Sequence, residues 1–343
     1  MTYKANNILI TGGAGFIGSN FIELILSTRY YNIVNIDALT YAGNLENLKG
    51  LEEKYSNYKF AKANILDKNI IKKILQDNEI DTIINFAAES HVDRSILDSS
   101  PFLDTNVKGT LNLLDLANEL KIQKFIQIST DEVYGSLGAE GFFTEQTPLN
   151  PNSPYSASKT SADMFALAYH HTYGTPVLIT RCSNNYGPKQ FPEKLIPLII
   201  SNCLENKQIP VYGDGLNVRD WIYVNDHNLA ILDVLEKGKI GQVYNIGSSN
   251  EKTNIEIVKT ILNILGKSEE LITYVKDRPG HDKRYAIDSS KIQNELGWSP
   301  KMNFENGIKQ TIEWYLNNQN WIKNIKNGDY MSYYEKNYSN KMI

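Results

Sequence analysis

The stretch Ile8-Leu9-Ile10-Thr11-Gly12-Gly13-Ala14-Gly15-Phe16-Ile17-Gly18 decides the fold. An apolar run leads into glycines that fit both G-x-x-G-x-x-G and G-x-G-x-x-G. Such glycines allow a tight turn and let backbone N–H groups at a helix N-terminus approach a pyrophosphate. A turn with positive φ would also select glycine, so the context matters. Asp37 ends the second expected strand, where a carboxylate binds ribose hydroxyls and repels a 2′-phosphate. The stretch therefore predicts a dinucleotide site that favours NAD over NADP.

The first half of the chain alternates between strand-like and helix-like patterns. The expected strands are Asn7 to Thr11, Ile33 to Asp37, Tyr58 to Ala63, Asp81 to Ala87, Lys124 to Thr130 and Pro176 to Arg181. The expected helices are Gly15 to Ser27, Lys68 to Gln76, Pro101 to Leu120 and Ser153 to Tyr173. This alternation is typical of βαβ units, whose right-handed crossovers give a parallel sheet covered on both faces. We therefore expect an α/β protein with a Rossmann-like, doubly wound parallel sheet.

The pattern changes after Arg181, where turn-rich polar stretches separate shorter elements. Trp221 to Val224 and Val243 to Gly247 look strand-like and could rejoin the sheet. We therefore predict a smaller α/β substrate domain that is interleaved with the first. The predicted division assigns 1–181, with returning segments near 220–247, to the NAD-binding domain, and 182–219 with 248–343 to the substrate domain. The tyrosine-rich segment Asp329 to Tyr334 is expected to dock by its aromatic rings.

The bulk composition constrains partners and location. Of the 343 residues 41% are hydrophobic, and a net charge of -4 is contrary to the basic surface that nucleic acids favour. The longest apolar runs are too short to span a bilayer, and no signal peptide precedes the first expected strand. Cys182 and Cys203 are the only cysteines, which fits a reducing cytoplasm, and the five histidines show no metal-ligand spacing. We expect a cytoplasmic protein with no metal, no membrane segment and no nucleic-acid partner.

Candidate catalytic groups lie in Ser129-Thr130-Asp131-Glu132 and at Tyr155 and Lys159. A Tyr and a Lys four residues apart share one helix face, so the ammonium can lower the phenol pKa and make Tyr155 a base toward a hydroxyl. Thr130 could supply a hydroxyl to the same substrate oxygen. Taken alone, the Tyr–Lys pair would be a surface pair, and the two acids would be solvated charges or helix caps. Beside a dinucleotide site they predict an acid–base step in addition to hydride transfer.

Six further segments extend over nearly the whole chain. They are Ala38-Leu39-Thr40-Tyr41-Ala42-Gly43, Ala87-Ala88-Glu89-Ser90-His91-Val92-Asp93, Ser129-Thr130-Asp131-Glu132-Val133-Tyr134-Gly135, Asn184-Asn185-Tyr186-Gly187-Pro188, Asp214-Gly215-Leu216-Asn217-Val218-Arg219-Asp220-Trp221 and Asp277-Arg278-Pro279-Gly280-His281-Asp282. Together they resemble the extended short-chain dehydrogenases/reductases that act on nucleotide sugars, the NAD-dependent epimerase/dehydratase family. The resemblance implies 4,6-dehydration of a nucleotide sugar, with dTDP-glucose as the expected substrate, in a deoxysugar pathway of the rhamnose type.

The resemblance implies a role for each catalytic candidate. Tyr155, assisted by Lys159 and Thr130, would take the C4 hydroxyl proton while a hydride moves from C4 to NAD. Glu132 would then remove the C5 proton, and Asp131 would protonate the leaving C6 hydroxyl. The hydride would return to C6, so the enzyme would be a hydro-lyase that regenerates its NAD. Elimination needs an acid and a base at adjacent carbons, and neighbouring carboxylates with separated pKa values meet that need.

The resemblance also implies the residues that contact the ligands. The cofactor contacts are Gly12, Gly15, Phe16, Ile17, Gly18, Asp37, Ala38, Leu39, Thr40, Asn64, Ile65, Ala87, Ser90, Thr105, Tyr155, Lys159 and Asn185. The substrate contacts are Ser90, Thr130, Asn184, Lys194, Arg219, Asn254, Arg278 and His281. Arg219 and Arg278 suit charge-assisted clamps on a pyrophosphate. The alternative for both is an ordinary ion pair, for instance of Arg219 with Asp220 or Asp214. Asn64 stands where an acidic residue is expected, and its amide can still hydrogen-bond an adenine.

Other activities remain open on the same fold. A 4-epimerase, a decarboxylase or a dehydratase of a UDP- or CDP-linked sugar would share the cofactor site, although an epimerase has no use for an acid–base pair at C5 and C6. A non-catalytic NAD-binding protein would not need the Tyr–Lys pair and both acids together. Thymine and uracil differ by one methyl group, which a pocket discriminates by only about 1–3 kcal/mol. The residues alone therefore leave the base open.

The two long helices expected at Pro101 to Leu120 and Ser153 to Tyr173 bear on assembly. They could simply cover the sheet. In similar proteins, two such helices from each subunit pair across a dimer as a four-helix bundle. We therefore predict a homodimer.

Overall fold

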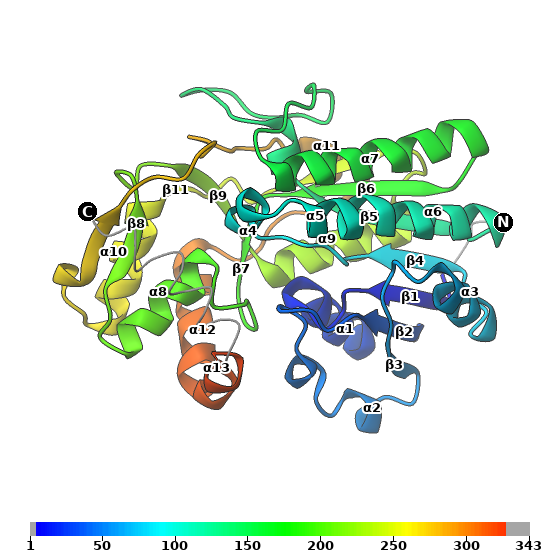
Figure 1. Cartoon of the computed structure of the whole chain (residues 1–343), viewed down its shortest axis with the longest axis horizontal. Coiled ribbons are helices and arrows are strands. Elements are labelled where there is room, and N and C mark those ends of the chain that lie inside the picture. Colours follow the sequence, from blue (N-terminus) through cyan, green and yellow to red (C-terminus); the bar gives the residue numbers. More distant parts are fainter. Residues whose placement is uncertain (1–4, 327–343) are drawn as a thin grey trace.

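The computed structural model describes residues 5 to 326, whose arrangement is shown in Figure 1. Within these residues seven strands form the main sheet, in the order β10-β6-β5-β4-β1-β2-β3, and each neighbouring pair runs parallel. The strands are β1 (Asn7–Thr11), β2 (Asn32–Asp37), β3 (Tyr58–Lys62), β4 (Thr82–Asn85), β5 (Lys124–Thr130), β6 (Val177–Cys182) and β10 (Val243–Ile246). The strand order reverses at β1 and β4, where such sheets bind ligands beyond the carboxyl ends of the strands. The predicted Rossmann-like, doubly wound fold is confirmed.

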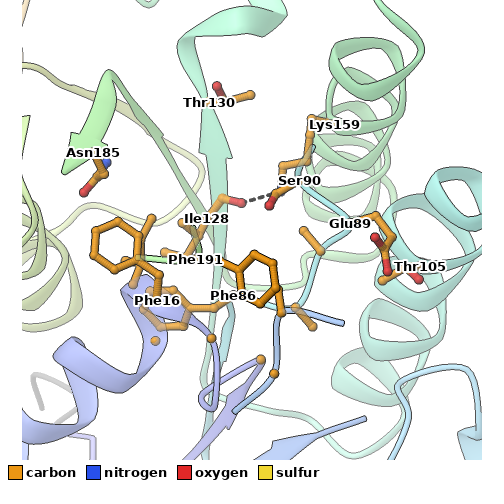
Figure 2. A pocket seen from close by; sticks show the side chains of 18 of the residues that line it. Phe16, Phe86, Glu89, Ser90, Thr105, Ile128, Thr130, Lys159, Asn185 and Phe191 are labelled. Carbon is orange, nitrogen blue, oxygen red and sulfur yellow. Dashed lines mark hydrogen bonds between the residues drawn. The ribbon is translucent and has the colours of Figure 1, made fainter. Parts of the chain in front are cut away.

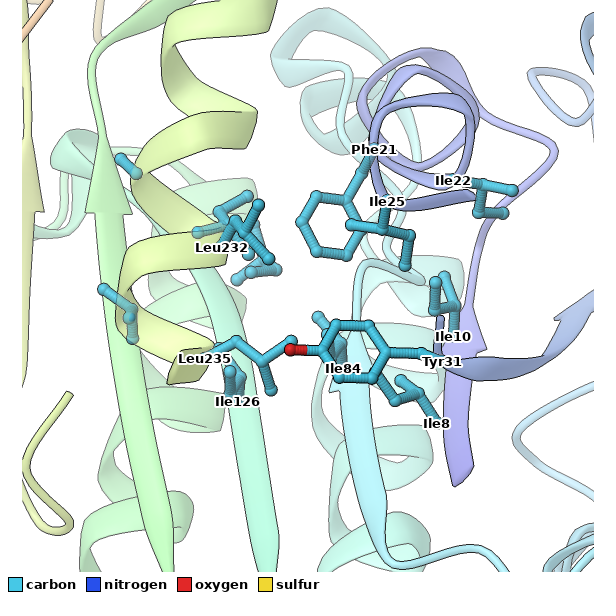
Figure 3. Packing of buried hydrophobic residues seen from close by; sticks show 14 of the residues in the cluster. Ile8, Ile10, Phe21, Ile22, Ile25, Tyr31, Ile84, Ile126, Leu232 and Leu235 are labelled. Carbon is cyan, nitrogen blue, oxygen red and sulfur yellow. The ribbon is translucent and has the colours of Figure 1, made fainter. Parts of the chain in front are cut away.

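Helices cover both faces of this sheet (Figure 1). One face carries α1 (Phe16–Thr28), α9 (Val224–Lys237) and α11 (Ser290–Leu296), and the other carries α3 (Lys68–Asp77), α6 (Thr110–Glu119) and α7 (Pro154–Tyr173). The alternation along β1 shows why: Ile8 and Ile10 pack with Phe21 of α1 (Figure 3), whereas Leu9 packs with Leu113 of α6 on the opposite side. Burial of each such side chain contributes about 1.5–3 kcal/mol. Two apolar layers therefore hold the strand ends in fixed positions.

A second core forms from residues that follow β6. Its sheet pieces are β7 (Asn184–Tyr186), β9 (Val218–Tyr223) and β11 (Glu251–Thr253), with β8 (Ile209–Tyr212) beside β12 (Ile272–Val275). Its helices are α8 (Leu195–Leu204), α10 (Asn254–Leu265), α12 (Phe304–Asn317) and α13 (Gln319–Ile325). Tyr186, Ile199, Trp221, Ile261 and Ile312 pack together at its centre. In Figure 1 these elements lie at one end of the main sheet, beside the carboxyl ends of its central strands.

Of the two segments expected to rejoin the main sheet, only one does so. β10 pairs with β6 at the sheet edge, as Val243 to Gly247 predicted. β9 instead pairs with β7 and β11 in a separate sheet, so the expectation for Trp221 to Val224 is wrong. The physical reason is packing, because the aromatic side chains of Trp221 and Tyr223 belong to the second core.

The helix expected at Pro101 to Leu120 is interrupted. The structure has α5 (Ser100–Phe102), a π-helical segment (Leu103–Gly109) and then α6, after the short helices α2 (Leu51–Lys54) and α4 (Val92–Leu97). Gly109 lies against Ile65, and a Cβ there would come within 2.4 Å of the Ile65 side chain. The wider π turns direct Thr105 toward the ligand cavity, whereas Leu103 is 62% exposed. π-Helical segments of this kind are frequent at functional sites.

The described residues also bear on membrane association and thiol chemistry. Every helix between residues 5 and 326 is too short or too polar to cross a membrane. Cys182 and Cys203 are free and buried. The tyrosine-rich segment Asp329 to Tyr334 lies outside the described residues.

Candidate active site

A cavity of about 300 Å³ opens at the carboxyl ends of the central strands, and Figure 2 shows part of its wall. It brings together most of the residues predicted from the sequence. These are Gly12, Gly15, Phe16, Ile17, Gly18, Asp37, Ala38, Thr40, Asn64, Ile65, Ala87, Ser90, Thr105, Thr130, Asp131, Glu132, Tyr155, Lys159, Asn184, Asn185 and Lys194. Five predicted residues lie outside this wall: Leu39, Arg219, Asn254, Arg278 and His281.

The glycine loop between β1 and α1 is shaped for close approach of a ligand to the backbone. Gly12 has a φ of +70°, and a Cβ there would lie 2.6 Å from the backbone nitrogen of Ala87. A Cβ on Gly18 would lie 2.6 Å from the Gly12 carbonyl oxygen. Gly15 caps α1 without a side chain, so the first N–H groups of this helix have no side-chain acceptor. These features fit the pyrophosphate of a dinucleotide.

Two side chains hold the glycine loop in place. Asp37, at the end of β2, accepts hydrogen bonds from the N–H groups of Ala14 at 2.9 Å and Leu39 at 2.8 Å. Burial raises the pKa of Asp37, and these two N–H groups lower it. Asn47 donates to the Ala14 carbonyl at 2.9 Å, and its own side-chain oxygen accepts from the Trp321 indole at 2.8 Å. Helix α13 therefore supports the loop from a distant part of the chain.

Thr130, Asp131 and Glu132 form a tight turn at the end of β5. The Thr130 hydroxyl accepts from the Glu132 N–H at 3.3 Å and so caps the turn. Burial raises the pKa of Asp131 well above its usual range, and the Glu132 charge adds to this effect. Burial also raises the pKa of Glu132, whereas three cations, Arg278, Lys194 and Arg219, lower it. Asp131 is therefore suited to hold a proton, and Glu132 is the better placed of the two to accept one.

Tyr155 and Lys159 lie in the first turns of α7. Ser153 caps this helix reciprocally with Ser156, and Pro154 begins it. Burial raises the Tyr155 pKa well above its usual range, Glu132 raises it further, and a hydrogen bond with Thr130 lowers it. The Lys159 ammonium donates to the Ile128 carbonyl of β5 at 2.6 Å (Figure 2). The Tyr155 pKa is therefore raised and not lowered as predicted, because burial and the Glu132 charge dominate.

The candidate substrate cations surround the Glu132 side of the site. Lys194 donates to the Ser90 carbonyl at 2.5 Å, and Arg278 forms an ion pair with Asp93 at 2.9 Å. Burial would raise the pKa of Asp93, but His91 and Arg278 bring it down to about 2. Arg278 therefore forms the ordinary ion pair that was its alternative, and it also lowers the pKa of Glu132.

Arg219 is held by backbone groups and an aromatic ring. Its guanidinium donates to the carbonyl oxygens of Val218 at 2.7 Å and Asp282 at 2.8 Å, and it lies 4.3 Å from the centre of the Tyr285 ring. Asp214 and Asp220 instead accept backbone N–H groups, those of Leu216 and Ser248. The alternative of an ordinary ion pair for Arg219 is therefore wrong.

His281 and Asn254 border this region. His281 is within 2.6 Å of Asp277, and burial together with Arg278 lowers its pKa to about 4, so its ring is neutral at neutral pH. Asn254 begins α10, and its N–H donates to the Asn217 carbonyl at 3.0 Å. His281 lies in the same turn-rich segment as Arg278, and Asn254 follows β11, whose Lys252 is paired with Arg219 of β9.

The cavity wall includes residues that the sequence had not assigned to it. They are Phe86, Glu89, Cys182, Gln190, Phe191 and Glu193, among others. Glu89 lies inside the motif from Ala87 to Asp93, and Glu193 directly precedes Lys194. Their positions beside predicted site residues could have indicated both. Glu193 accepts from Arg94 at 3.0 Å. Burial raises the pKa of Glu89.

Comparison with known proteins assigns the family. Residues 9–311 match the family model described as GDP-mannose 4,6 dehydratase, and the chain belongs to this family. It is 52% identical over 340 residues to a protein of Xanthomonas campestris pv. campestris (strain B100) named dTDP-glucose 4,6-dehydratase, covering 94% of this chain and 96% of the relative. The resemblance found in the motifs is thereby confirmed.

Two solved structures are similar over nearly their full length. A dTDP-glucose 4,6-dehydratase from Bacillus anthracis str. Ames in complex with NAD is 55% identical, with a TM-score of 0.88, covering 94% of this chain and 100% of that chain. DesIV, a dTDP-glucose 4,6-dehydratase from Streptomyces venezuelae with NAD and TYD bound, is 45% identical, with a TM-score of 0.91, covering 93% of this chain and 100% of that chain.

Proposed function

We propose that this protein is an NAD-dependent dTDP-glucose 4,6-dehydratase, a hydro-lyase that forms dTDP-4-keto-6-deoxyglucose. The relatives described above have this activity in their names. The observation that carries the proposal is the arrangement of Asp131, Glu132 and Tyr155 in one cavity with a dinucleotide loop. A redox step alone would leave the two carboxyl groups of Asp131 and Glu132 without a role. Removal of water across C5 and C6 needs an acid and a base, and Asp131 and Glu132 can supply them.

The cofactor half of the cavity is built to hold NAD. The N–H groups at the start of α1 would face the pyrophosphate, and Asp37 would face the adenosine ribose. NAD held by these residues would supply the reversible hydride acceptor that oxidation at C4 and reduction at C6 require. Tyr155 removes the C4 hydroxyl proton, with Thr130 hydrogen-bonded to the phenol and Lys159 held beside β5. Oxidation at C4 then acidifies the C5 proton.

The acid–base pair completes the elimination. Glu132 removes the C5 proton; burial raises its pKa, and three nearby cations offset part of this rise. Asp131, which burial keeps protonated, gives its proton to the leaving C6 hydroxyl so that water departs. Glu132 returns its proton to C5 as the hydride reaches C6. The proton that Tyr155 took from the C4 hydroxyl balances the one that Asp131 lost with the departing water, so exchange with solvent restores both groups. This division of tasks rests on two neighbouring carboxyls with different pKa values.

The cations of the second core are proposed to hold the sugar nucleotide. Arg219 and Arg278 would clamp its pyrophosphate by charge-assisted hydrogen bonds. Ser90, Asn184, Lys194, Asn254 and His281 are proposed to contact the remaining parts of the substrate.

The test is the product that purified variants make from dTDP-glucose. Asp131→Asn and Glu132→Gln should slow water loss by about 10²–10⁴-fold, since each removes one proton-transfer group. NAD binding and C4 oxidation, followed by absorbance at the NADH band, should persist. Glu53→Gln, an exposed carboxyl in α2, is the matched control and should behave as the parent. Unchanged water loss in both variants would overturn the assignment.

A parallel assay with dTDP-, UDP- and CDP-glucose determines the base preference. We expect dTDP-glucose to give the highest kcat/KM. A product of unchanged mass would instead indicate a 4-epimerase, and no turnover with or without NAD would indicate a binding protein.

We propose that the chain forms a homodimer through α6 and α7, which pair across the interface as a four-helix bundle. Several apolar side chains on this side of the molecule are exposed: Leu97 53%, Leu103 62%, Met164 44% and Phe165 39%. Light scattering at micromolar concentration should give twice the chain mass of 38.9 kDa. Phe165→Glu should shift this mass toward the monomer, and Phe142→Glu, an exposed aromatic outside these helices, should not. A monomeric parent would overturn the proposal.

We further propose a cytoplasmic location and a place in deoxysugar formation. Two free, buried thiols suit a reducing compartment. A 4-keto-6-deoxy sugar nucleotide is a substrate for enzymes that epimerise or reduce a ketone. Cell fractionation with an activity assay tests the location.

A further inference from the structure

His227 is a buried imidazole that contacts the cavity wall from behind. It lies in α9 and is 0% exposed. Its Nδ1 is 2.9 Å from the side-chain oxygen of Asn185, a residue of β7 that lines the cavity. Figure 2 shows Asn185 on the side of the cavity opposite Ser90 and Glu89. The acid–base steps proposed for the reaction leave His227 without a role.

The hydrogen bonds of Asn185 define which way its amide faces. The side-chain nitrogen donates to the Ser183 carbonyl at 3.1 Å and to the Cys182 sulfur at 3.4 Å. The side-chain oxygen therefore faces His227, and Nδ1 of the ring must carry the hydrogen. Burial lowers the His227 pKa to about 3, so the ring is neutral and donates this one hydrogen bond. Its Nε2 is buried without an acceptor or donor among residues 5–326.

The position of Asn185 makes its orientation consequential. β6 ends at Cys182, which is paired in register with Thr130 at the end of β5. Asn185 follows three residues later, beside the part of the cavity that holds Thr130 and Tyr155. The Asn185 carbonyl also accepts from Gln190 at 2.9 Å, so the same residue anchors the segment that leads to Lys194. A rotated Asn185 amide would present different polar groups to a bound cofactor.

We propose that His227 is a positioning residue that fixes the orientation of the Asn185 amide and thereby sets the affinity for NAD. The donor at Nδ1, rather than the bulk of the ring, is the required feature. The inference rests on the proposed function only in that the cavity binds NAD.

The experiment compares two substitutions of similar polarity. His227→Asn keeps an amide nitrogen near the position of Nδ1, whereas His227→Gln moves it toward the position of Nε2. NAD affinity of the cofactor-free protein is measured by calorimetric titration, together with the melting temperature of each variant. We expect His227→Gln to weaken NAD binding by about 3- to 10-fold, and His227→Asn to stay within about 2-fold of the parent, because one hydrogen bond is lost in the first case only.

A double-mutant cycle separates positioning from general support of the fold. In an Asn185→Ala background, His227→Gln should change NAD affinity by less than about 2-fold, because its partner is already absent. Equal weakening by both His227 variants, or an undiminished effect of His227→Gln in that background, would overturn the inference.

Failure of the inference can be told from failure of the proposed function. The parent protein is assayed for NAD binding and for dTDP-glucose conversion in the same preparation. NAD binding with the expected variant pattern but no conversion contradicts the proposed activity alone. Conversion by the parent without the variant pattern contradicts the role of His227 alone.

Discussion

The glycine loop after β1 and the acidic turn after β5 end at the same edge of one sheet, yet they are built in opposite ways. The loop has no capping side chain at Gly15, and the first N–H groups of α1 have no side-chain acceptor, which leaves them to a ligand. The turn is capped by its own Thr130, and its polar groups are two carboxyls inside the protein. The loop binds through shape and backbone dipoles, which suits a cofactor used by many enzymes. The turn acts through the protonation states of particular side chains, which suits one reaction.

Among three further variants that compare these regions, the largest effect is expected from a single methyl group in the loop. Gly12→Ala would place a Cβ 2.6 Å from the Ala87 backbone nitrogen at a φ of +70°. Strain and displacement of the loop together cost about 3 kcal/mol, so NAD affinity should fall by about 100-fold in a calorimetric titration. Gly174→Ala is the matched control, since its φ is +71° with open space around it. It should lower stability by about 1 kcal/mol and leave NAD binding intact. Parent-like binding by Gly12→Ala would show that the loop is not shaped by this contact.

A smaller effect is expected from the cations around the turn. Arg278→Gln removes one of the charges that lower the Glu132 pKa. Glu132 must be ionised to act as a base, so activity falls as the pH drops through its pKa, and a higher pKa moves this limb upward. We expect the acidic limb of kcat/KM to rise by about 0.5–1 pH unit and KM for the sugar nucleotide to increase by about 10-fold. Arg284→Gln, whose arginine pairs with Glu251 at 2.6 Å, is the control. Identical pH profiles for both variants would contradict the role given to Arg278.

The smallest effect concerns the stability that the protein loses when the buried Asp131 of the acidic turn ionises. Burial raises the pKa of Asp131 in the folded protein above that of an aspartate in an unfolded chain. The folded state therefore holds this proton more tightly, and the parent loses stability as the pH rises above about 4. Asp131→Asn lacks this loss, so its melting temperature should exceed that of the parent by about 2–4 °C at pH 7, and by less at pH 5. Glu53→Gln should show no such pH-dependent gain. A lower melting temperature for Asp131→Asn at pH 7 would mean that the carboxylate stabilises the fold.

The two regions also differ in how far the sequence predicts them. The glycine loop can be predicted from local sequence. The positive φ, the close approach of the backbone and the start of the helix all depend on residues within one short stretch, and Asp37 stands at the end of the next strand. The acidic turn could be located after an apolar strand, but the separate pKa values of its two acids depend on Arg278, Lys194 and Arg219. Those cations come from distant segments, and only the family resemblance pointed to them.

Three features were beyond the sequence for physical reasons. The sequence predicted that β9 is a strand, but aromatic packing in the second core determines which sheet it joins. The π-helical segment interrupts a pattern that reads as one helix, and it ends at Gly109, which lies against Ile65 from a distant part of the chain. The partner of Lys159 was unpredictable from spacing alone, because helix periodicity places it near Tyr155, while the Ile128 carbonyl belongs to another element.

The two hydrogen bonds that link Trp321 to Asn47 and Asn47 to Ala14 have a consequence for folding during synthesis. It joins residues 274 positions apart, so the support of the glycine loop is completed by one of the last described helices. During synthesis the N-terminal strands emerge first, but this contact can form only after residue 321 has left the ribosome. Contacts of such long sequence separation form late and slow folding. The glycine loop is thus among the first parts to be synthesised, and the contacts that support it are among the last to form.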